Sequence, residues 1–242
     1  MDILEILKDD VKYYGEFGKQ YLSNSDISTL LTNPKAFGIS RPDNANFAKG
    51  RLFHQLILEP EKASEWEFVD VGSRNTKAYK EFIAERDVEF ALLQKEADEI
   101  SQLVTTMMSN VDFYDDIRHD ENQYEVPAVG EIEGVMWKGK ADIVHPDMII
   151  DLKTTSKIDD FKWSARKYNY DSQCYIYQQL FGKPLVFYVI DKTNNMLGIF
   201  RPTEEFIRGG ADKVKRAVDV YNKFFGDNAT EDINYFYVED YL

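Results

Sequence analysis

The sequence predicts an α/β fold, with a mixed central β-sheet flanked by helices and preceded by a helical N-terminal half. Residues 1–118 are rich in helix formers, with apolar residues at three- and four-residue spacing. From Asn122 onward, short apolar runs end at turn signals, as strands do. Helices on either side of such a strand meander indicate a sheet with helices packed against it.

In the helical half, residues 23–26 supply N-cap candidates for a short helix that ends at Asn33 and Pro34. Gly50 is expected to precede a helix that stops near Pro60. From Thr76 onward the chain reads as helical, and one apolar stripe recurs at helical spacing. We expect this stripe to face the core; its members are Leu93, Ala97, Ile100, Val104, Met107 and Val111.

In the second half, the segments QYEVPAVGEIEG, VMWKGKADIV and MIIDLKTT read as three consecutive strands. Their turn signals are Glu133-Gly134 and residues 145–147. We then expect a helix closed by Gly182, a strand pair around residues 192–195, and a final helix over 203–225.

We expect one domain over residues 1–242, because this length suits a single sizeable core. Its parts are a mainly helical region (1–120), a core (121–225) and an acidic C-terminal tail (226–242). The tail lacks Lys and Arg, and it is either a solvated end or a segment that docks on another subunit or protein.

Composition narrows the classes of protein. With 43% apolar and 14% aromatic residues, the chain is not of the disordered type. It has no apolar run long enough to cross a membrane, and its acidic, amphipathic start is unlike a signal peptide. The single cysteine excludes an intrachain disulfide and an all-cysteine metal site, so a cytoplasmic location fits best. The net charge of −14 counts against a nucleic-acid partner, unless positive charge is concentrated locally or metal ions offset an acidic site.

Charged residues lie near the ends of two neighbouring predicted strands. Asp142 lies late in one predicted strand, and Asp151 and Lys153 lie on one face of the next. The short turn between the strands brings both carboxylates to one end of the sheet. Carboxylates held close repel each other unless a cation lies between them, and Mg²⁺ prefers such oxygens. A metal there suits phosphodiester hydrolysis, with the Lys153 ammonium steadying the developing charge. The alternative from spacing alone is a structural Asp–Lys ion pair at a strand end.

The pattern GKAD…IIDLKTT, with Asp142, Asp151 and Lys153, resembles the PD-(D/E)xK nuclease core of the restriction-endonuclease-like fold. Ala141 stands where the first motif has Pro, a frequent departure in that superfamily. More specifically, the chain resembles the phage-type RecE (exonuclease VIII)-like exonucleases and, more distantly, lambda exonuclease. Asp-x-Lys alone is a weak signal, but three further segments match in order, over about 160 residues in all; they are LSNSDISTLLTNPKAFG, KGRLFHQLILEPEK and YDSQCYIYQQL.

The resemblance implies roles for further residues. His54 takes the place of a metal-binding histidine, although a lone histidine on an apolar helix is otherwise a core residue. Gln173 and Tyr177 share a helix face and are implied to support the site or touch the DNA backbone; as a bare pair they would be surface or interface residues. The carbonyl of Leu152 is implied as a further ligand.

A further carboxylate from the strand before Asp142 is either Glu125 or Glu131, and we favour Glu125. One or two Mg²⁺ or Mn²⁺ ions are expected in the site.

Two basic clusters weaken the charge objection, because positive charge concentrated around a site can offset an acidic chain. Aromatic residues of the first cluster (Phe161, Trp163, Tyr168 and Tyr170) either stack on bases or belong to the core. We expect the clusters to face phosphates; the first is Lys157, Lys162, Arg166 and Lys167 beside Lys153, and the second is Lys35, Arg41, Lys49 and Arg51.

The resemblance implies a metal-dependent exonuclease that acts on double-stranded DNA ends. It implies 5′→3′ resection that leaves 3′ single strands for an annealing protein, a ring-like homo-oligomer, and a phage or prophage origin. A structure-specific endonuclease of the same fold is the alternative, although relatives of that kind often carry a four-cysteine cluster that one cysteine cannot form. A silent DNA-binding subunit is the third reading, and it would have no chemical need for Asp142, Asp151 and Lys153 together.

Overall fold

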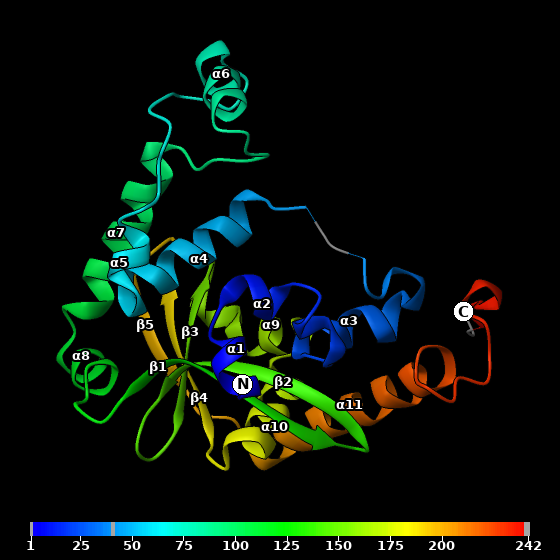
Figure 1. Ribbon diagram of the computed structural model, residues 1–242. Coiled ribbons are helices and arrows are strands. Elements are labelled where there is room, and N and C mark those ends of the chain that lie inside the picture. Colours follow the sequence, from blue (N-terminus) through cyan, green and yellow to red (C-terminus); the bar gives the residue numbers. More distant parts are fainter. Residues whose placement is uncertain (1, 40–41, 240–242) are drawn as a thin grey trace.

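The structure is a computed structural model that describes residues 2–39 and 42–239, so Arg41 of the second basic cluster and residues 240–242 of the tail lie outside the described residues. It confirms the predicted fold class. Five strands form one mixed sheet in the order β1-β2-β3-β4-β5, with helices on both faces (Figure 1). The strands are β1 (Gln123–Ile132), β2 (Val135–Val144), β3 (Ile149–Thr155), β4 (Leu185–Asp191) and β5 (Leu197–Phe200).

Strand directions follow from the connections. The tight turn at Glu133-Gly134 makes β1 and β2 an antiparallel hairpin, and both turn residues have positive φ, as a two-residue turn of this hand requires. β2 and β3 are also antiparallel, whereas β3 and β4 are parallel. The parallel pair needs a crossover, which η3 (Ile158–Asp160), α9 (Phe161–Lys167) and α10 (Tyr170–Phe181) supply.

One buried core lies on each face of the sheet. The first joins α4 (Ala45–Leu58), α7 (Gln94–Met108) and α8 (Val111–Ile117) to the face that carries Ile150 and Leu152. The second joins α3 (Asn24–Thr32), α10 and α11 (Glu204–Phe224) to the face that carries Ile149 and Phe187. The sheet therefore separates the early helices from the late ones, except that α3 crosses to the late side (Figure 1).

The N-terminal segment completes the edge of β2. It contains α1 (Ile3–Leu7), α2 (Asp10–Tyr14) and η1 (Gly18–Gln20). Beyond it, Leu22 donates its N–H to the carbonyl of Met136 (3.0 Å) and accepts from the N–H of Lys138 (2.8 Å). Leu22 thus takes the position beside β2 that β3 does not reach.

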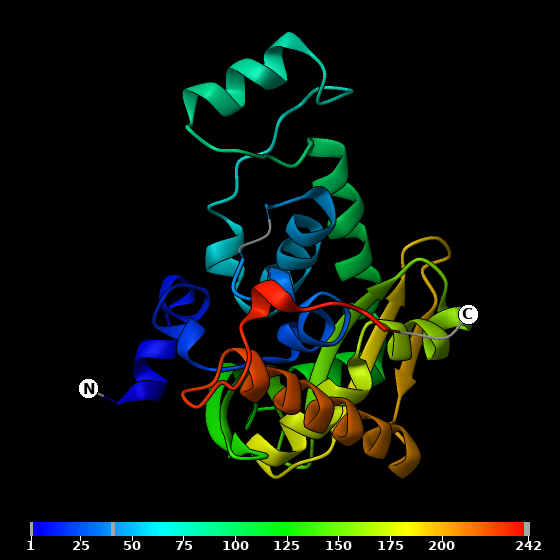
Figure 2. The same cartoon turned by 90° about the vertical axis from the view of Figure 1, so that its right-hand side faces the viewer.

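A helical arm projects from the body between α5 (Pro60–Ala63) and α7. It carries α6 (Lys77–Glu85), which both views show standing away from the sheet (Figures 1 and 2). The arm has a small core of its own, formed by Val69, Tyr79, Ala91 and Leu93. The two remaining short elements are η2 (Pro34–Ala36) and η4 (Ile233–Tyr235).

Two details of the helical half differ from the sequence prediction. Helix α4 begins at Ala45 rather than after Gly50, because the Asn44 side chain accepts the N–H groups of Asn46 and Phe47 and caps the helix earlier. The helical stretch predicted from Thr76 is interrupted at Asp87, whose φ is 51°.

The predicted apolar stripe is otherwise buried or packed against the first core, apart from Val111, which is 69% exposed at the start of α8. The division of the chain into a helical part, a core and a tail remains a prediction. Within the described residues, no helix combines the length and the hydropathy that a membrane span requires.

Two glycines test these helix boundaries. Gly182 ends α10 with φ 67°, so Gly182→Ala should lower the free energy of unfolding by about 1 kcal/mol. Gly50 lies inside α4 with open space around it, so Gly50→Ala should raise that free energy by about 0.5–1 kcal/mol. Urea denaturation followed by circular dichroism measures both. A destabilised Gly50→Ala protein would contradict the extended α4.

Candidate metal centre at the fork of two strands

The candidate site lies where β2 and β3 part. The two strands are paired only at Ile143–Ile150 and Val144–Ile149, and beyond these pairs they diverge. Asp142 and Asp151 stand at the point of divergence, and both are buried. There the Asp142 Oδ2 accepts the N–H of Leu152 at 2.7 Å, in place of a backbone carbonyl. The side chain of Asp142 thereby holds the fork open.

Leu152 has two roles at this fork. Its side chain is fully buried in the first core. Because the N–H and C=O of one strand residue point to the same side, its carbonyl faces the fork together with the N–H that Asp142 accepts. The carbonyl is thus directed as the predicted ligand role requires.

His54 and Glu125 approach Asp142 from two other elements. His54 on α4 places its Nδ1 3.3 Å from Asp142 Oδ1. Glu125 lies across from Asp142 on β1, since the register pairs Tyr124 with Ile143 and Val126 with Ala141. One ligand atom from each of His54, Glu125 and Asp142 lies within 4.8 Å of the others, so the three side chains form a group that can hold a cation.

The backbone of Glu125 is unusual. Its φ is 51°, although it is neither glycine nor asparagine and lies inside a strand. Such a conformation costs on the order of 1 kcal/mol or more and persists where the surroundings demand it. Glu131, the alternative carboxylate, is exposed six residues further along the same strand and lies outside the group of three.

Asp151 is held by two donors. Gln173 on α10 donates its Nε2–H to Asp151 Oδ1 at 2.6 Å, and Lys153 forms an ion pair with the other oxygen, Oδ2. Lys153 also lies 5.0 Å from the centroid of the Tyr170 ring. Asp151 and Lys153 therefore share one face of β3, as alternation predicts. The Asp151 carboxylate lies between the Gln173 amide and the Lys153 ammonium, which fix its position.

Tyr177, one turn after Gln173, does not face the carboxylates. Its hydroxyl donates to the carbonyl of Lys140 at 2.8 Å, two residues before Asp142. Its ring lies over Gly139, where a Cβ would come within 3.1 Å of the ring carbons. Tyr177 thus fixes the strand that carries Asp142, and its ring leaves little room for a side chain at position 139.

Burial and neighbouring charges shift the pKa values of the site in opposite directions. Burial, and then the Asp142 carboxylate, raise the pKa of Glu125 to about 8. Burial disfavours the imidazolium of His54, yet Asp142 outweighs this and raises the pKa of His54 to about 9. Burial also raises the pKa of Asp151. The pKa of Asp142 is lowered, because His54 and the other donors outweigh its burial.

These residues fit a hard divalent cation. Carboxylate oxygens with an imidazole form a donor set suited to Mg²⁺ or Mn²⁺. Burial and the Asp142 carboxylate raise the pKa of Glu125, and a cation at this place would favour the charged form of that side chain. His54, Glu125 and Asp142 would hold it, with Asp151 and the Leu152 carbonyl on the adjoining strand of the fork.

The predicted basic residues flank the fork on two sides, and several are engaged by acids. On α4, Lys49 pairs with Glu96 at 3.1 Å and Arg51 pairs with Asp43. After β3, Lys157 pairs with Asp160 at 3.0 Å, and Arg166 lies over the Phe206 ring. Lys162 and Lys167 are exposed on α9, and Lys35 is exposed near the tail, 3.2 Å from the carbonyl of Asn234.

The four aromatic residues of the first cluster are expected either to stack on bases or to belong to the core, and the structure shows two in the interior and two exposed. Phe161 is buried, and Tyr170 packs against the second core, so these two belong to the interior. Trp163 and Tyr168 are 77% and 58% exposed. Only these last two of the four are free to stack on a ligand.

One set of ion pairs near the site could not be predicted from the sequence. Asp10 on α2 bridges Lys140 of β2 (2.5 Å) and Lys62 of α5 (2.9 Å). Asp10 belongs to an acidic stretch in which nothing distinguishes it, so only the fold shows its contact.

A comparison with solved structures agrees with this fold. A crystal structure of a presumed exonuclease from Eubacterium rectale superimposes with a TM-score of 0.64 at 19% identity, covering 88% of this chain and 86% of that one. The structure of SSO0001 aligns with a TM-score of 0.33 at 12% identity, covering 71% and 85%, and carries no weight here. None of the curated proteins matches the chain.

The mixed sheet and the fork with Asp142, Asp151 and Lys153 define a domain of the PD-(D/E)xK nuclease class, as the sequence predicts. Over residues 35–231 the chain matches the model of one family within this class. It belongs to the family described as "PDDEXK-like domain of unknown function (DUF3799)".

Metal binding at this site should depend on pH. A proton on Glu125 competes with the cation below about pH 8, and a proton on His54 competes with it below about pH 9. The apparent affinity for Mn²⁺, measured by isothermal titration calorimetry, should therefore fall by more than about a thousandfold from pH 8 to pH 6, because two protons compete with the cation.

Glu125→Gln is the matched variant, because it keeps the shape of the side chain and removes one titrating group. It should bind Mn²⁺ more weakly and with a shallower pH dependence. Equal affinity at both pH values in the unaltered protein would contradict this ligand set.

Proposed function

We propose that this protein is a metal-dependent deoxyribonuclease that hydrolyses phosphodiester bonds from DNA ends. The observation that carries the proposal is the meeting of Asp142 with the Asp151–Lys153 pair at one fork, beside His54 and Glu125. These groups come from α4, β1, β2 and β3, so the fold converges on this point. A structural ion pair alone would not gather an imidazole and further buried carboxylates around it.

Each side chain has a role that its contacts support. Asp142, Glu125 and His54 hold the cation, with Asp151 and the Leu152 carbonyl as further ligands. When bound, Mg²⁺ or Mn²⁺ supplies positive charge for the phosphoryl oxygens. Lys153 carries its ammonium into the same fork and stabilises negative charge that develops on the phosphate.

Two residues of α10 act through their neighbours. Gln173 orients Asp151 by donating to one of its oxygens, and Tyr177 fixes the strand that presents Asp142. Lys49, Arg51, Lys157, Lys162, Arg166 and Lys167 are proposed to contact the DNA backbone on the two sides of the fork.

The finer activity follows from the resemblance to RecE-like exonucleases. We infer 5′→3′ resection of double-stranded ends, a ring-like homo-oligomer, delivery of 3′ single strands to an annealing protein, and action in the cytoplasm of a bacterial host. The name given to the Eubacterium rectale protein is in keeping with an exonuclease. One or two metal ions per site are compatible with the donor set.

Cleavage of two DNA forms tests the proposal. With Mg²⁺ or Mn²⁺, the protein should degrade end-labelled linear duplex and leave covalently closed circles intact. Asp151→Asn should lower the rate by at least about a thousandfold, because the fork loses a carboxylate and the partner of Lys153. Gel analysis of labelled products measures both effects and shows which strand is shortened.

The other outcomes separate the alternatives. Nicked circles would identify an endonuclease of the same fold. No cleavage of either DNA under several metals and salt concentrations would favour a silent DNA-binding subunit. Asp151→Asn cutting at the normal rate would show that the site assignment is wrong.

The ammonium of Lys153 should be needed for the chemical step. Lys153→Met keeps the length of the side chain and should lower kcat by about a hundredfold or more, because the ammonium at the fork is lost. Lys95→Met is the matched control, since Lys95 is exposed on α7 away from the fork. Single-turnover rates at saturating protein measure the effect. Equal rates in the two variants would remove Lys153 from the mechanism.

A further inference from the structure

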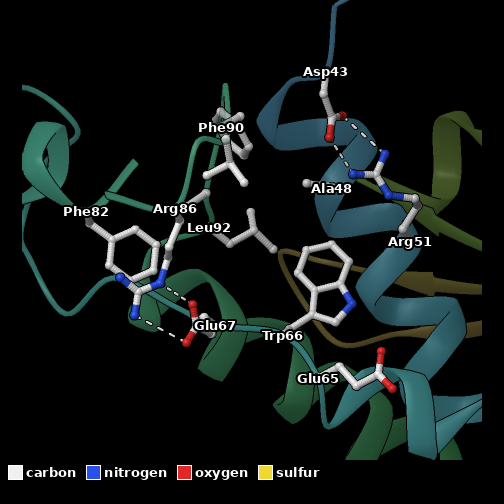
Figure 3. A pocket seen from close by; sticks show the side chains of 12 residues that line it. Asp43, Ala48, Arg51, Glu65, Trp66, Glu67, Phe82, Arg86, Phe90 and Leu92 are labelled. Carbon is white, nitrogen blue, oxygen red and sulfur yellow. Dashed lines mark hydrogen bonds and ion pairs between the residues drawn. The ribbon is translucent and has the colours of Figure 1, made fainter. Parts of the chain in front are cut away.

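A cavity opens beside the helix that carries His54. It has a volume of about 370 Å³, in the range of small-molecule sites. Helix α4 forms one wall, the segment after α5 forms the floor, and the α6 arm with the strand-like segment after it forms the opposite wall (Figure 3). None of its lining residues belongs to the proposed metal centre.

The cavity is lined by aromatic faces and guanidinium groups. Trp66 stands at its centre between α4 and the arm, with Phe82 on the far side and Phe90 above (Figure 3). The Trp66 Nε1–H donates to Gln55 Oε1 at 2.6 Å, which fixes the plane of the indole. Arg51 lies 5.8 Å from the Trp66 ring centroid, and Arg86 lies 4.0 Å from that of Phe82.

Both guanidinium groups of the cavity are paired with carboxylates of the cavity itself. Arg51 pairs with Asp43, and Arg86 pairs with Glu67, as the dashed lines in Figure 3 show. Glu65 adds one further carboxylate to the lining. A free phosphate would meet more negative than positive charge here. A flat, neutral ring with donors and acceptors on its edge matches the aromatic faces, the guanidinium donors and the carboxylate acceptors together.

The cavity is also placed beside the fork. Arg51 lines it and lies one turn before His54 on α4, a rise of about 4.5 Å. Gln55, which holds Trp66, is the residue after His54, so its side chain points about 100° further around α4. Because Arg51 lines the cavity and lies one turn from His54, a strand whose phosphate occupies the fork can place a neighbouring base at the mouth of the cavity.

The geometry points to a binding site for one unpaired nucleobase, stacked on Trp66 next to the phosphate in the fork. This inference rests on the proposed function, because it takes the fork as the place of the phosphate. A paired base cannot enter a cavity of this kind, so the site would favour ends whose terminal pair has opened. It would thereby contribute to the recognition of DNA ends.

Abasic substitution tests the site without cleavage. A fluorescein-labelled duplex carries one abasic residue at each of the terminal four positions of either strand in turn. Binding is measured by fluorescence anisotropy in EDTA, so that no divalent cation supports hydrolysis. For the unaltered protein, one position should weaken binding about tenfold, because base–aromatic stacking is lost. A 2-aminopurine at that position should be quenched on binding.

The Trp66 variants show whether this cavity is responsible. Trp66→Leu should reduce the abasic effect to about twofold or less, and Trp66→Phe should restore most of it. Arg86→Gln is a second variant on the opposite wall, exposed enough to spare the fold, and should also diminish the effect. Tyr235→Leu is the control, because Tyr235 is 81% exposed in the tail. Thermal melts verify that each variant is folded.

Two results would overturn the inference: no position at which an abasic residue weakens binding, or equal sensitivity in folded Trp66→Leu and the unaltered protein. Its failure is distinct from that of the proposed function. Cleavage of linear DNA without an abasic effect would remove the base site alone. An abasic effect that Trp66→Leu abolishes, in a protein that cleaves nothing, would keep the base site and remove the nuclease.

Discussion

The hydrogen bond from the Leu152 N–H to the Asp142 carboxylate is the contact on which the site depends. At this point β2 stops pairing with β3, and a side chain takes over from the backbone. The cost of an unpaired buried N–H is avoided, and the fork opens without loss of order in either strand. Further along β2, Leu22 pairs with the free edge, so the opening is confined to the residues around Asp142.

The electrostatics of the fork follow from this confinement. Asp142 and Asp151 are buried on adjacent strands, and Glu125 faces Asp142 from the other side. Without a cation, the protein compensates with the donors it has: His54 and Leu152 at Asp142, and Gln173 and Lys153 at Asp151. Glu125 lacks a comparable donor, and its pKa rises to about 8. A proton on Glu125 thus offsets the third carboxylate of the site, and a divalent cation would replace that proton, which agrees with the donor set.

The two halves of the chain contribute differently to function. The sheet and α10 hold the aspartates and Lys153 rigidly, because a buried core covers each face of the sheet. The helical half supplies His54 on α4 and, earlier on the same helix, one wall of the Trp66 cavity. The arm with α6 forms the opposite wall of that cavity (Figure 3). The proposed cleavage site in the fork and the proposed base-binding site around Trp66 therefore meet at α4.

The sequence by itself determined the fold class, the strand order of the meander, the Glu133-Gly134 turn and the placement of Asp151 and Lys153 on one face of a strand. These depend on local periodicity and turn chemistry, which a chain carries within a few residues. It also pointed to His54, Asp142 and Gln173 through ordered motifs. It did not show that α4 begins at Ala45, that Tyr177 contacts the backbone of Lys140, or that Phe161 and Tyr170 are buried while Trp163 and Tyr168 are not.

Only the tertiary structure decided which distant groups meet. Asp10 and Lys140 are 130 residues apart, and Gln173 and Asp151 are 22 apart, so no local pattern encodes either contact. The choice of Glu125 over Glu131 as the nearer carboxylate depends on the register of β1 against β2 and on the positive φ of Glu125. The cavity around Trp66 depends on how the arm returns to α4. In each case the position of a side chain is set by packing between elements, which propensity and spacing do not specify.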